Sequence, residues 1–122
     1  MKTVAVIGAS NDRSKFGNKA VRAFAQTGYQ VFPVHPALTE VEGLTCYKSI
    51  LDLPSKPNLV SVYLGPARLV QILPDIAAKG CDELWLNPGT ESEEVFAKAK
   101  ELGLKTVPLC SIIAVGLSPS QL

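Results

Sequence analysis

The sequence has few of the residues that build metal sites or disulfide frameworks. Its 122 residues include one histidine and three cysteines, Cys46, Cys81 and Cys110, with no pair in CxxC spacing. An odd number of widely spaced cysteines argues against a zinc site or a disulfide scaffold and favours a reducing compartment. No apolar run approaches the roughly 20 residues of a membrane span, and the stretch before Gly8 is too short for a signal-peptide core. We therefore expect a cytoplasmic protein with no membrane partner.

The chain also lacks an excess of charge of either sign. Twelve Lys and Arg stand against 11 Asp and Glu, which gives a net charge of +1. No overall field attracts a nucleic-acid backbone, so any anion must be bound locally. A chain that is 47% hydrophobic and 19% charged is typical of a globular protein. We expect one domain, residues 1–122, which is large enough to fold without disulfides.

Short apolar runs alternate with segments of helical periodicity. The runs predict strands at residues 3–7, 29–34, 59–64, 82–86 and 104–109, and the periodic segments predict helices at 16–28, 67–79 and 92–102. Pro74 is expected to kink or divide the second helix. Strands that are apolar throughout are typical of a parallel sheet covered on both faces. The predicted fold is therefore α/β, Rossmann-like and doubly wound, with a mostly parallel five-stranded sheet and helices on both faces.

Two segments do not follow this alternation. Between the second and third strands, Glu42-Gly43 predicts a turn, Leu44–Tyr47 a short edge strand and Ser49–Leu53 a single helical turn. The tail from Ile112 to Leu122 is apolar but interrupted by glycine and proline. It is expected to pack on the sheet or on a second copy of the chain, so a homodimer stays open.

Ligands of open parallel sheets bind at the carboxyl ends of the strands. This rule selects the five loops that begin at Gly8, His35, Gly65, Asn87 and Cys110. Of the other residues that could carry chemistry, Trp85 is expected in the core because it lies in mid-strand, and Cys46 and Cys81 are treated as structural.

The first loop, residues 8–18, has the composition of a phosphate-binding site. It joins a strand to a helix start, where free backbone N–H groups and the helix dipole favour an anion. Gly8 permits a sharp turn, Ser10 offers a hydroxyl, and Arg13 and Lys15 supply positive charge. The loop is neither a Walker motif nor GxGxxG. The alternative is a polar loop whose glycines only permit a turn.

The second loop argues against an ordinary NAD enzyme. A dinucleotide-binding domain needs an acid at the end of its second strand for the ribose hydroxyls, but this strand ends Val34-His35-Pro36 and the next carboxylate is Glu40. His35 itself is interpreted either as a ligand contact or as a hydrogen-bonded structural residue.

The remaining loops carry weaker indications. The segment Leu64-Gly65-Pro66 could lie against a flat ligand or serve only to begin a helix. The turn Asn87-Pro88-Gly89 could contact a ligand through its backbone and the Asn87 amide. Cys110 is either a small buried hydrophobic residue or a thiol that faces the pocket.

Several of these motifs together resemble a known family. VAVIGAS (residues 4–10), the Lys15-Phe16-Gly17 element, GYQVFPVHP (28–36) and EGLTCYKSILDLP (42–54) resemble the small stand-alone CoA-binding proteins. Those proteins are similar to the CoA-binding Rossmann domain of the succinyl-CoA synthetase α subunit. The resemblance runs from about Val4 to Cys110.

The resemblance implies a set of ligand contacts. Phosphate oxygens would lie at the first loop, adenosine at the second, the nucleotide or the start of pantetheine at the third, and the remaining contacts at the last two loops. The implied residues are Gly8, Ala9, Ser10, Arg13, Lys15, Gly17, His35, Pro36, Leu64, Gly65, Pro66, Asn87, Pro88, Gly89 and Cys110. The chain departs from the family pattern at His35, which is usually Asn, at WLNPG in place of WLQxG, and at PLC in place of DRC. The last two departures concern the far wall of the pocket.

The sequence thus predicts a protein that binds CoA or acyl-CoA, a small nucleotide ligand, without catalysis of its own. Three alternatives stay open. The protein could be an NAD(P)-type redox or sensor protein, or a redox switch in which Cys110 forms a mixed disulfide with the CoA thiol. It could also be an interaction module whose loops bind nothing.

Overall fold

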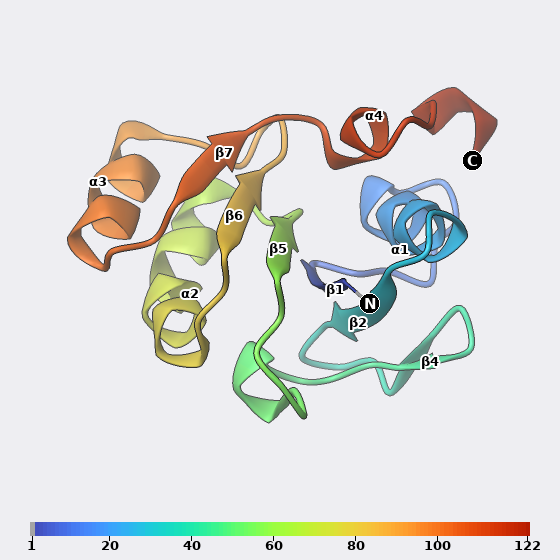
Figure 1. The fold of residues 1–122 in the computed structure, drawn as a ribbon, viewed down its shortest axis with the longest axis horizontal. Coiled ribbons are helices and arrows are strands. Elements are labelled where there is room, and N and C mark those ends of the chain that lie inside the picture. The colour runs from blue at the N-terminus through green and yellow to red at the C-terminus, as the bar shows by residue number, and fades with distance from the viewer. Residues whose placement is uncertain (1) are drawn as a thin grey trace.

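The computed structural model describes residues 2–122 and contains one five-stranded sheet. Its strands are β1 (Thr3–Ile7), β2 (Gln30–Val34), β5 (Leu59–Val62), β6 (Glu83–Leu86) and β7 (Thr106–Pro108). They are all parallel, in the order β2-β1-β5-β6-β7 (Figure 1). The predicted α/β, Rossmann-like fold is confirmed. The chain reverses its direction of winding between β1 and β5, which places the crevice for ligands there.

Helices cover both faces of this sheet (Figure 1). One face carries α1 (Phe16–Gln26) and the short α4 (Ser111–Ala114); the other carries α2 (Pro66–Lys79) and α3 (Glu93–Glu101). Alternate side chains of β1 point to opposite faces, as the pleat requires. Val4 and Val6 pack in the core on the α1 side, whereas Ala5 and Ile7 pack in the core on the α2 side. Both cores exclude water, which explains why the strands are largely apolar on both faces.

The predicted elements are present, but their ends differ by a few residues. The third predicted strand stops at Val62 instead of Leu64, because its neighbour β1 ends at Ile7 and turns away at Gly8. Tyr63 and Leu64 are thereby released into the ligand-side loop. The predicted division at Pro74 is wrong, because α2 runs unbroken across this residue, and the kink stays a prediction.

The segment between β2 and β5 forms a separate hairpin. Strands β3 (Glu40–Val41) and β4 (Leu44–Thr45) pair with each other around a turn at Glu42 and Gly43, both with positive φ. The edge strand predicted at residues 44–47 is therefore shorter than expected, and only Tyr47 bridges to the main sheet, at Val34. The predicted helical turn is present as the 3₁₀ turn η1 (Ile50–Asp52).

The C-terminal tail folds back onto the same chain. Ile112 of α4 is buried in the core beside α1, and the second 3₁₀ turn, η2 (Pro119–Gln121), follows. The Lys19 ammonium donates a hydrogen bond to the Pro119 carbonyl at 2.9 Å. Of the two predicted packing modes, the structure shows the intramolecular one.

Within residues 2–122, no helix is both long enough and apolar enough to cross a lipid bilayer. The same residues contain no cluster of three or more metal-ligating His, Cys, Asp or Glu side chains.

Candidate functional site

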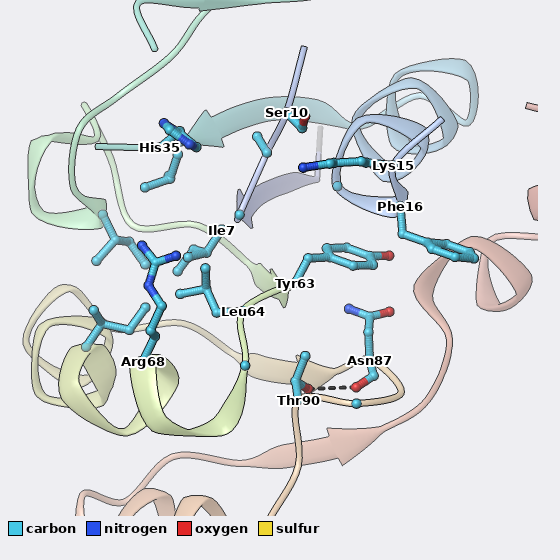
Figure 2. Close-up of a pocket in the computed structure, with 18 of the residues that line it drawn as sticks. Ile7, Ser10, Lys15, Phe16, His35, Tyr63, Leu64, Arg68, Asn87 and Thr90 are labelled. Carbon is cyan, nitrogen blue, oxygen red and sulfur yellow. Dashed lines mark hydrogen bonds between the residues drawn. The ribbon is translucent and has the colours of Figure 1, made fainter. Parts of the chain in front are cut away.

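A cavity of about 980 Å³ opens at the carboxyl edge of the sheet. All five loops selected from the sequence contribute to its lining, together with the first turns of α1 and α2 (Figure 2). The cavity lies over the junction of β1 and β5, where the strand order reverses. This position is where a doubly wound sheet binds its ligand.

Two glycines allow the first loop and α1 to pack closely. Gly8 has a φ of +91°, and a Cβ there would lie 2.7 Å from the Tyr63 carbonyl oxygen. A Cβ on Gly17 would lie 2.1 Å from the Gly8 carbonyl oxygen. Both contacts are with backbone atoms, which cannot rotate away. The loop between Gly8 and Gly17 is therefore fixed against β5 on one side and the helix start on the other.

Side chains of the loop hold its shape internally. The Asp12 carboxylate accepts hydrogen bonds from the Ser14 hydroxyl at 2.7 Å and the Ser14 N–H at 3.0 Å, which hold the pKa of Asp12 below its usual value. The buried Asn18 amide donates to the Ser10 carbonyl at 2.9 Å. The loop is thus ordered by its own contacts before any ligand binds.

The backbone N–H groups of the loop are not equally available. Gly8 N–H and Ala9 N–H both donate to the Val34 carbonyl, at 3.1 and 3.3 Å. The resemblance implies that Gly8 and Ala9 contact phosphate. Their backbone N–H groups are already bonded to Val34, so neither is free to donate to a phosphate oxygen. In contrast, Ser10, Phe16 and Gly17 have N–H groups with no acceptor among residues 2–122, and no side chain caps α1.

Three cations surround the cavity without a partner. Lys15, Lys48 and Arg68 line it, and none forms an ion pair or a side-chain hydrogen bond with any residue in the described range 2–122. Figure 2 shows Lys15 and Arg68 extending into the cavity from opposite walls. One acid, Asp75, is among the lining residues. The electrostatic environment of the cavity favours a ligand with more than one negative charge.

Arg13, predicted as a phosphate contact, is placed differently. Its guanidinium pairs with the Glu42 carboxylate at 3.1 Å, on the β3–β4 hairpin, and the residue is not among those that line the cavity. The pairing depends on a hairpin 29 residues away in the chain, so the composition of the loop alone could not reveal it.

His35 lies at the cavity wall with one ring nitrogen occupied. Its Nδ1 accepts a hydrogen bond from the Ala37 N–H at 3.0 Å, which places the proton of a neutral ring on Nε2. Nε2 has no partner among residues 2–122, so it remains available as a donor to a ligand oxygen. The hydrogen bond at Nδ1 confirms the structural interpretation of His35, and the ligand contact through Nε2 stays a prediction.

Asn87 lines the cavity, but its side chain serves the fold. Its amide nitrogen donates to the Ser61 hydroxyl at 3.0 Å and the Val62 carbonyl at 2.9 Å, and its oxygen accepts from the Ser111 N–H at 2.8 Å. The residue is 1% exposed. Both amide hydrogens are thus used and the oxygen accepts one hydrogen bond, so no donor of the amide is free for a ligand. The suggested ligand contact of Asn87 stays a prediction. Asn87 ties β5 and β6 to α4.

Tyr63 and Cys110 also line the cavity, and Tyr63 lies directly beside Gly8 of the first loop. The Tyr63 hydroxyl is buried and has no hydrogen-bond partner within residues 2–122, and the hydroxyls of Ser61 and Ser111 bond to each other at 2.8 Å. Burial raises the pKa of Tyr63 to about 12, although these two hydroxyls oppose the shift. Cys110 is a free thiol that lines the same cavity.

The structure brings together every residue implied by the resemblance except Arg13 and Pro66, which do not line the cavity. Pro66 instead occupies the first position of α2, where its missing N–H is harmless. Sequence reasoning missed Lys48, Tyr63 and Arg68. Of these three residues, Arg68 could most easily have been found from the sequence, because it lies in the first turn of a helix that begins at a selected loop.

Comparisons with known proteins agree with this geometry. The family model described as CoA binding domain matches residues 2–116. The uncharacterized protein YneT of Bacillus subtilis is 24% identical over 114 residues, which cover 93% of this chain and 84% of YneT. Acetate–CoA ligase (ADP-forming) II of Archaeoglobus fulgidus is 37% identical over 82 residues, which cover 65% of this chain but 12% of the ligase. The chain therefore spans only a small part of that enzyme.

Solved structures extend the similarity to the fold. A hypothetical protein from Pyrococcus horikoshii OT3 superposes with a TM-score of 0.86 at 31% sequence identity, covering 93% of this chain and 80% of that one. The family match includes every strand of the main sheet and all five cavity loops. The chain belongs to the CoA binding domain family.

Proposed function

We propose that this protein binds CoA or an acyl-CoA in the cavity at the carboxyl edge of its sheet. The observation that carries the proposal is a group of three cations, Lys15, Lys48 and Arg68, around one cavity, which have no partner among residues 2–122. Membership of the CoA binding domain family supports the choice of ligand. Three free thiols fit a cytoplasmic setting.

The diphosphate of CoA fits the start of α1. The free N–H groups of Ser10, Phe16 and Gly17 lie where the helix dipole attracts an anion, and the Lys15 ammonium adds a full positive charge. The Ser10 hydroxyl already accepts from the Asp12 N–H at 3.0 Å, so its own proton is free to bind a phosphate oxygen. These groups therefore fit a diphosphate without rearrangement of the loop.

The remaining cations fit the second anionic group of CoA, the 3′-phosphate. Lys48 precedes η1 and Arg68 lies on α2, and these two elements pack against each other. His35 and Pro36 directly follow strand β2 and line the same cavity, where they would contact the adenosine. We define this part of the cavity, lined by His35, Lys48 and Arg68, as its basic half. NAD lacks a 3′-phosphate and would leave these cations unpaired.

Calorimetric titration with CoA tests the proposal. Lys15→Ala removes a cation from the diphosphate site and is expected to raise the Kd at least tenfold, about 1.4 kcal/mol. Arg13→Ala is the matched control, since it removes a cation of the same loop that is already paired with Glu42. It is expected to change the Kd less than twofold. Equal losses in both variants, or no binding by the unmodified protein, would contradict the proposal.

Titration with dephospho-CoA and NAD tests the second anionic site. Both ligands retain a diphosphate but lack the 3′-phosphate, so each is expected to bind at least tenfold more weakly than CoA. Arg68→Ala is expected to abolish most of this preference. Equal affinity for CoA and dephospho-CoA would remove the assignment of the basic half.

A second candidate function is a thiol–disulfide switch, which the position of Cys110 on the cavity wall favours. The Cys110 thiolate would attack a CoA disulfide, form a mixed disulfide with CoA and release the other thiol. Mass spectrometry after incubation with CoA disulfide would detect an adduct of CoA mass. The adduct must be absent in Cys110→Ser; no adduct on the unmodified protein would exclude this function.

A further inference from the structure

The cavity is divided into two parts of different chemistry. Opposite the basic half lies a part lined by Phe16, Tyr63, Cys110, Ile113 and Pro119, which we call the apolar half. It contains none of the unpartnered cations except Lys15 at its border. Figure 2 shows Phe16 and Tyr63 on the side away from His35 and Arg68. A ligand that spans the cavity therefore passes from a charged end to an apolar end.

The apolar half exposes two large side chains that a water-soluble surface would normally cover. Phe16 is 52% exposed and Ile113 is 64% exposed. Phe16 begins α1, and Ile113 lies on α4, which packs against α1. Both line the same cavity as the proposed diphosphate site. The two exposed side chains therefore adjoin the proposed ligand site and do not lie apart from each other on the surface.

The wall that carries Ile113 is held firmly in place. Its neighbour Ile112 is fully buried, and the Ser111 N–H is bonded to Asn87. Lys19 donates to the Pro119 carbonyl and lies 5.6 Å from the centre of the Phe16 ring. The tail thus forms a rigid border to the cavity, which positions apolar surface before any ligand binds.

A buried hydroxyl on the same wall lacks a partner among residues 2–122. The Tyr63 hydroxyl is protonated at neutral pH, so it can both donate and accept a hydrogen bond. An unsatisfied buried hydroxyl is costly, so a carbonyl oxygen brought beside it would recover a hydrogen bond. The pantetheine amides and the thioester of an acyl-CoA both carry such an oxygen.

From these observations we infer that the preferred ligand is an acyl-CoA whose acyl chain is apolar and several carbons long, and that the chain lies between Phe16 and Ile113. This inference rests on the proposed function, because the diphosphate at α1 determines which end of the ligand reaches the apolar half. The C-terminal tail then acts as the wall that selects the acyl group.

Affinities for CoA, butyryl-CoA and octanoyl-CoA test this inference. A fully buried methylene strengthens binding about fourfold. Partial cover by two half-exposed side chains is expected to make octanoyl-CoA bind at least tenfold more tightly than butyryl-CoA. The measured quantity is the ratio of the two Kd values within each protein, so a general loss of CoA binding does not disturb it.

Phe16→Ser and Ile113→Ser are expected to reduce this ratio to less than threefold. The matched controls are Phe96→Ser and Leu51→Ser, which remove exposed apolar side chains that do not line the cavity, 38% and 48% exposed. Both controls are expected to keep the ratio of the unmodified protein. Since all four side chains are exposed, none of the variants should prevent folding.

Each other outcome has a distinct meaning. If CoA binds but the octanoyl chain brings no gain in affinity, the inference is overturned and the proposed function is left intact. The same conclusion follows if the gain in affinity persists in both Phe16→Ser and Ile113→Ser. Failure of CoA itself to bind removes the proposed function and the inference together. If the unmodified protein sediments as a dimer that Ile113→Ser dissociates, and no chain-length gain is seen, the apolar half is an interface between two copies.

Discussion

The start of α1 packs closely against the first loop at Gly17, and Gly17→Ala perturbs this packing directly. The added Cβ would lie 2.1 Å from the Gly8 carbonyl oxygen, whereas ordinary van der Waals contacts begin at about 3.4 Å. Gly8 cannot retreat freely, because it is itself packed against the Tyr63 carbonyl. The substitution must therefore move either the first loop or the start of α1.

Two effects of opposite sign decide the result. Replacing a helical glycine with alanine stabilises a helix by up to about 1 kcal/mol, and by less in its first turn. Overpacking against a backbone that cannot relax costs about 1–3 kcal/mol. We expect the steric effect to win, with a net loss of at least about 1 kcal/mol and a fall in Tm of roughly 4 °C or more. Because Gly17 also supplies a free N–H, the Kd for CoA should rise at least tenfold.

Thermal unfolding and calorimetric titration measure the two effects. Gly65→Ala is the control for stability, because Gly65 has a φ of −63° and a Cβ there meets nothing within 4 Å. Alanine lowers the entropy of the unfolded chain, which stabilises the protein, whereas the loss of glycine at the helix cap destabilises it. These two effects should offset each other to within about 1 kcal/mol. The reasoning is refuted if Gly17→Ala is as stable as the unmodified protein and binds CoA equally well.

Two further predictions concern buried groups. Asn87→Ala leaves the Ser111 N–H and the Val62 carbonyl without their partner, so urea unfolding should show a loss of about 2–3 kcal/mol, and a loss below 0.5 kcal/mol would contradict the role of the amide. Burial raises the pKa of Cys81 to about 11 and that of Tyr63 to about 12, against 9.0 and 10.0 for the unperturbed groups. Because the unfolded chain releases these protons first, the free energy of unfolding should be insensitive to both groups below pH 9 and should fall as the pH rises from 9 to 12. Cys81→Ala and Tyr63→Phe should each reduce that slope, and an unchanged slope in both would show that neither group is linked to folding.

The sheet could be predicted from the sequence because its information is local. Runs such as residues 3–7 and 59–62 are apolar at all but one position each, and the helices between them end at glycines such as Gly28, which has a φ of +91°. The carboxyl-edge rule then follows from the fold class without knowledge of any contact. This is why 13 of the 15 residues selected from the sequence line the cavity.

The remaining features depend on contacts between distant segments. Arg13 is neutralised by Glu42, which reaches it only because the β3–β4 hairpin lies over the first loop. Lys48 and Arg68 meet in one cavity because η1 packs on α2. The Asn87 amide is satisfied by residues of β5 and α4. None of these pairings leaves a periodic or compositional pattern in the sequence.

An NMR titration of the ¹⁵N-labelled protein with CoA tests the central claim most directly, because it reports on each backbone amide separately. The account predicts that the largest shifts occur at the N–H groups of Ser10, Phe16 and Gly17, which have no acceptor in the range 2–122. Gly28 and Gly103, whose surroundings are open and which do not line the cavity, should not shift. Saturating CoA that leaves Ser10, Phe16 and Gly17 unmoved, or that shifts only residues away from this cavity, would contradict the account.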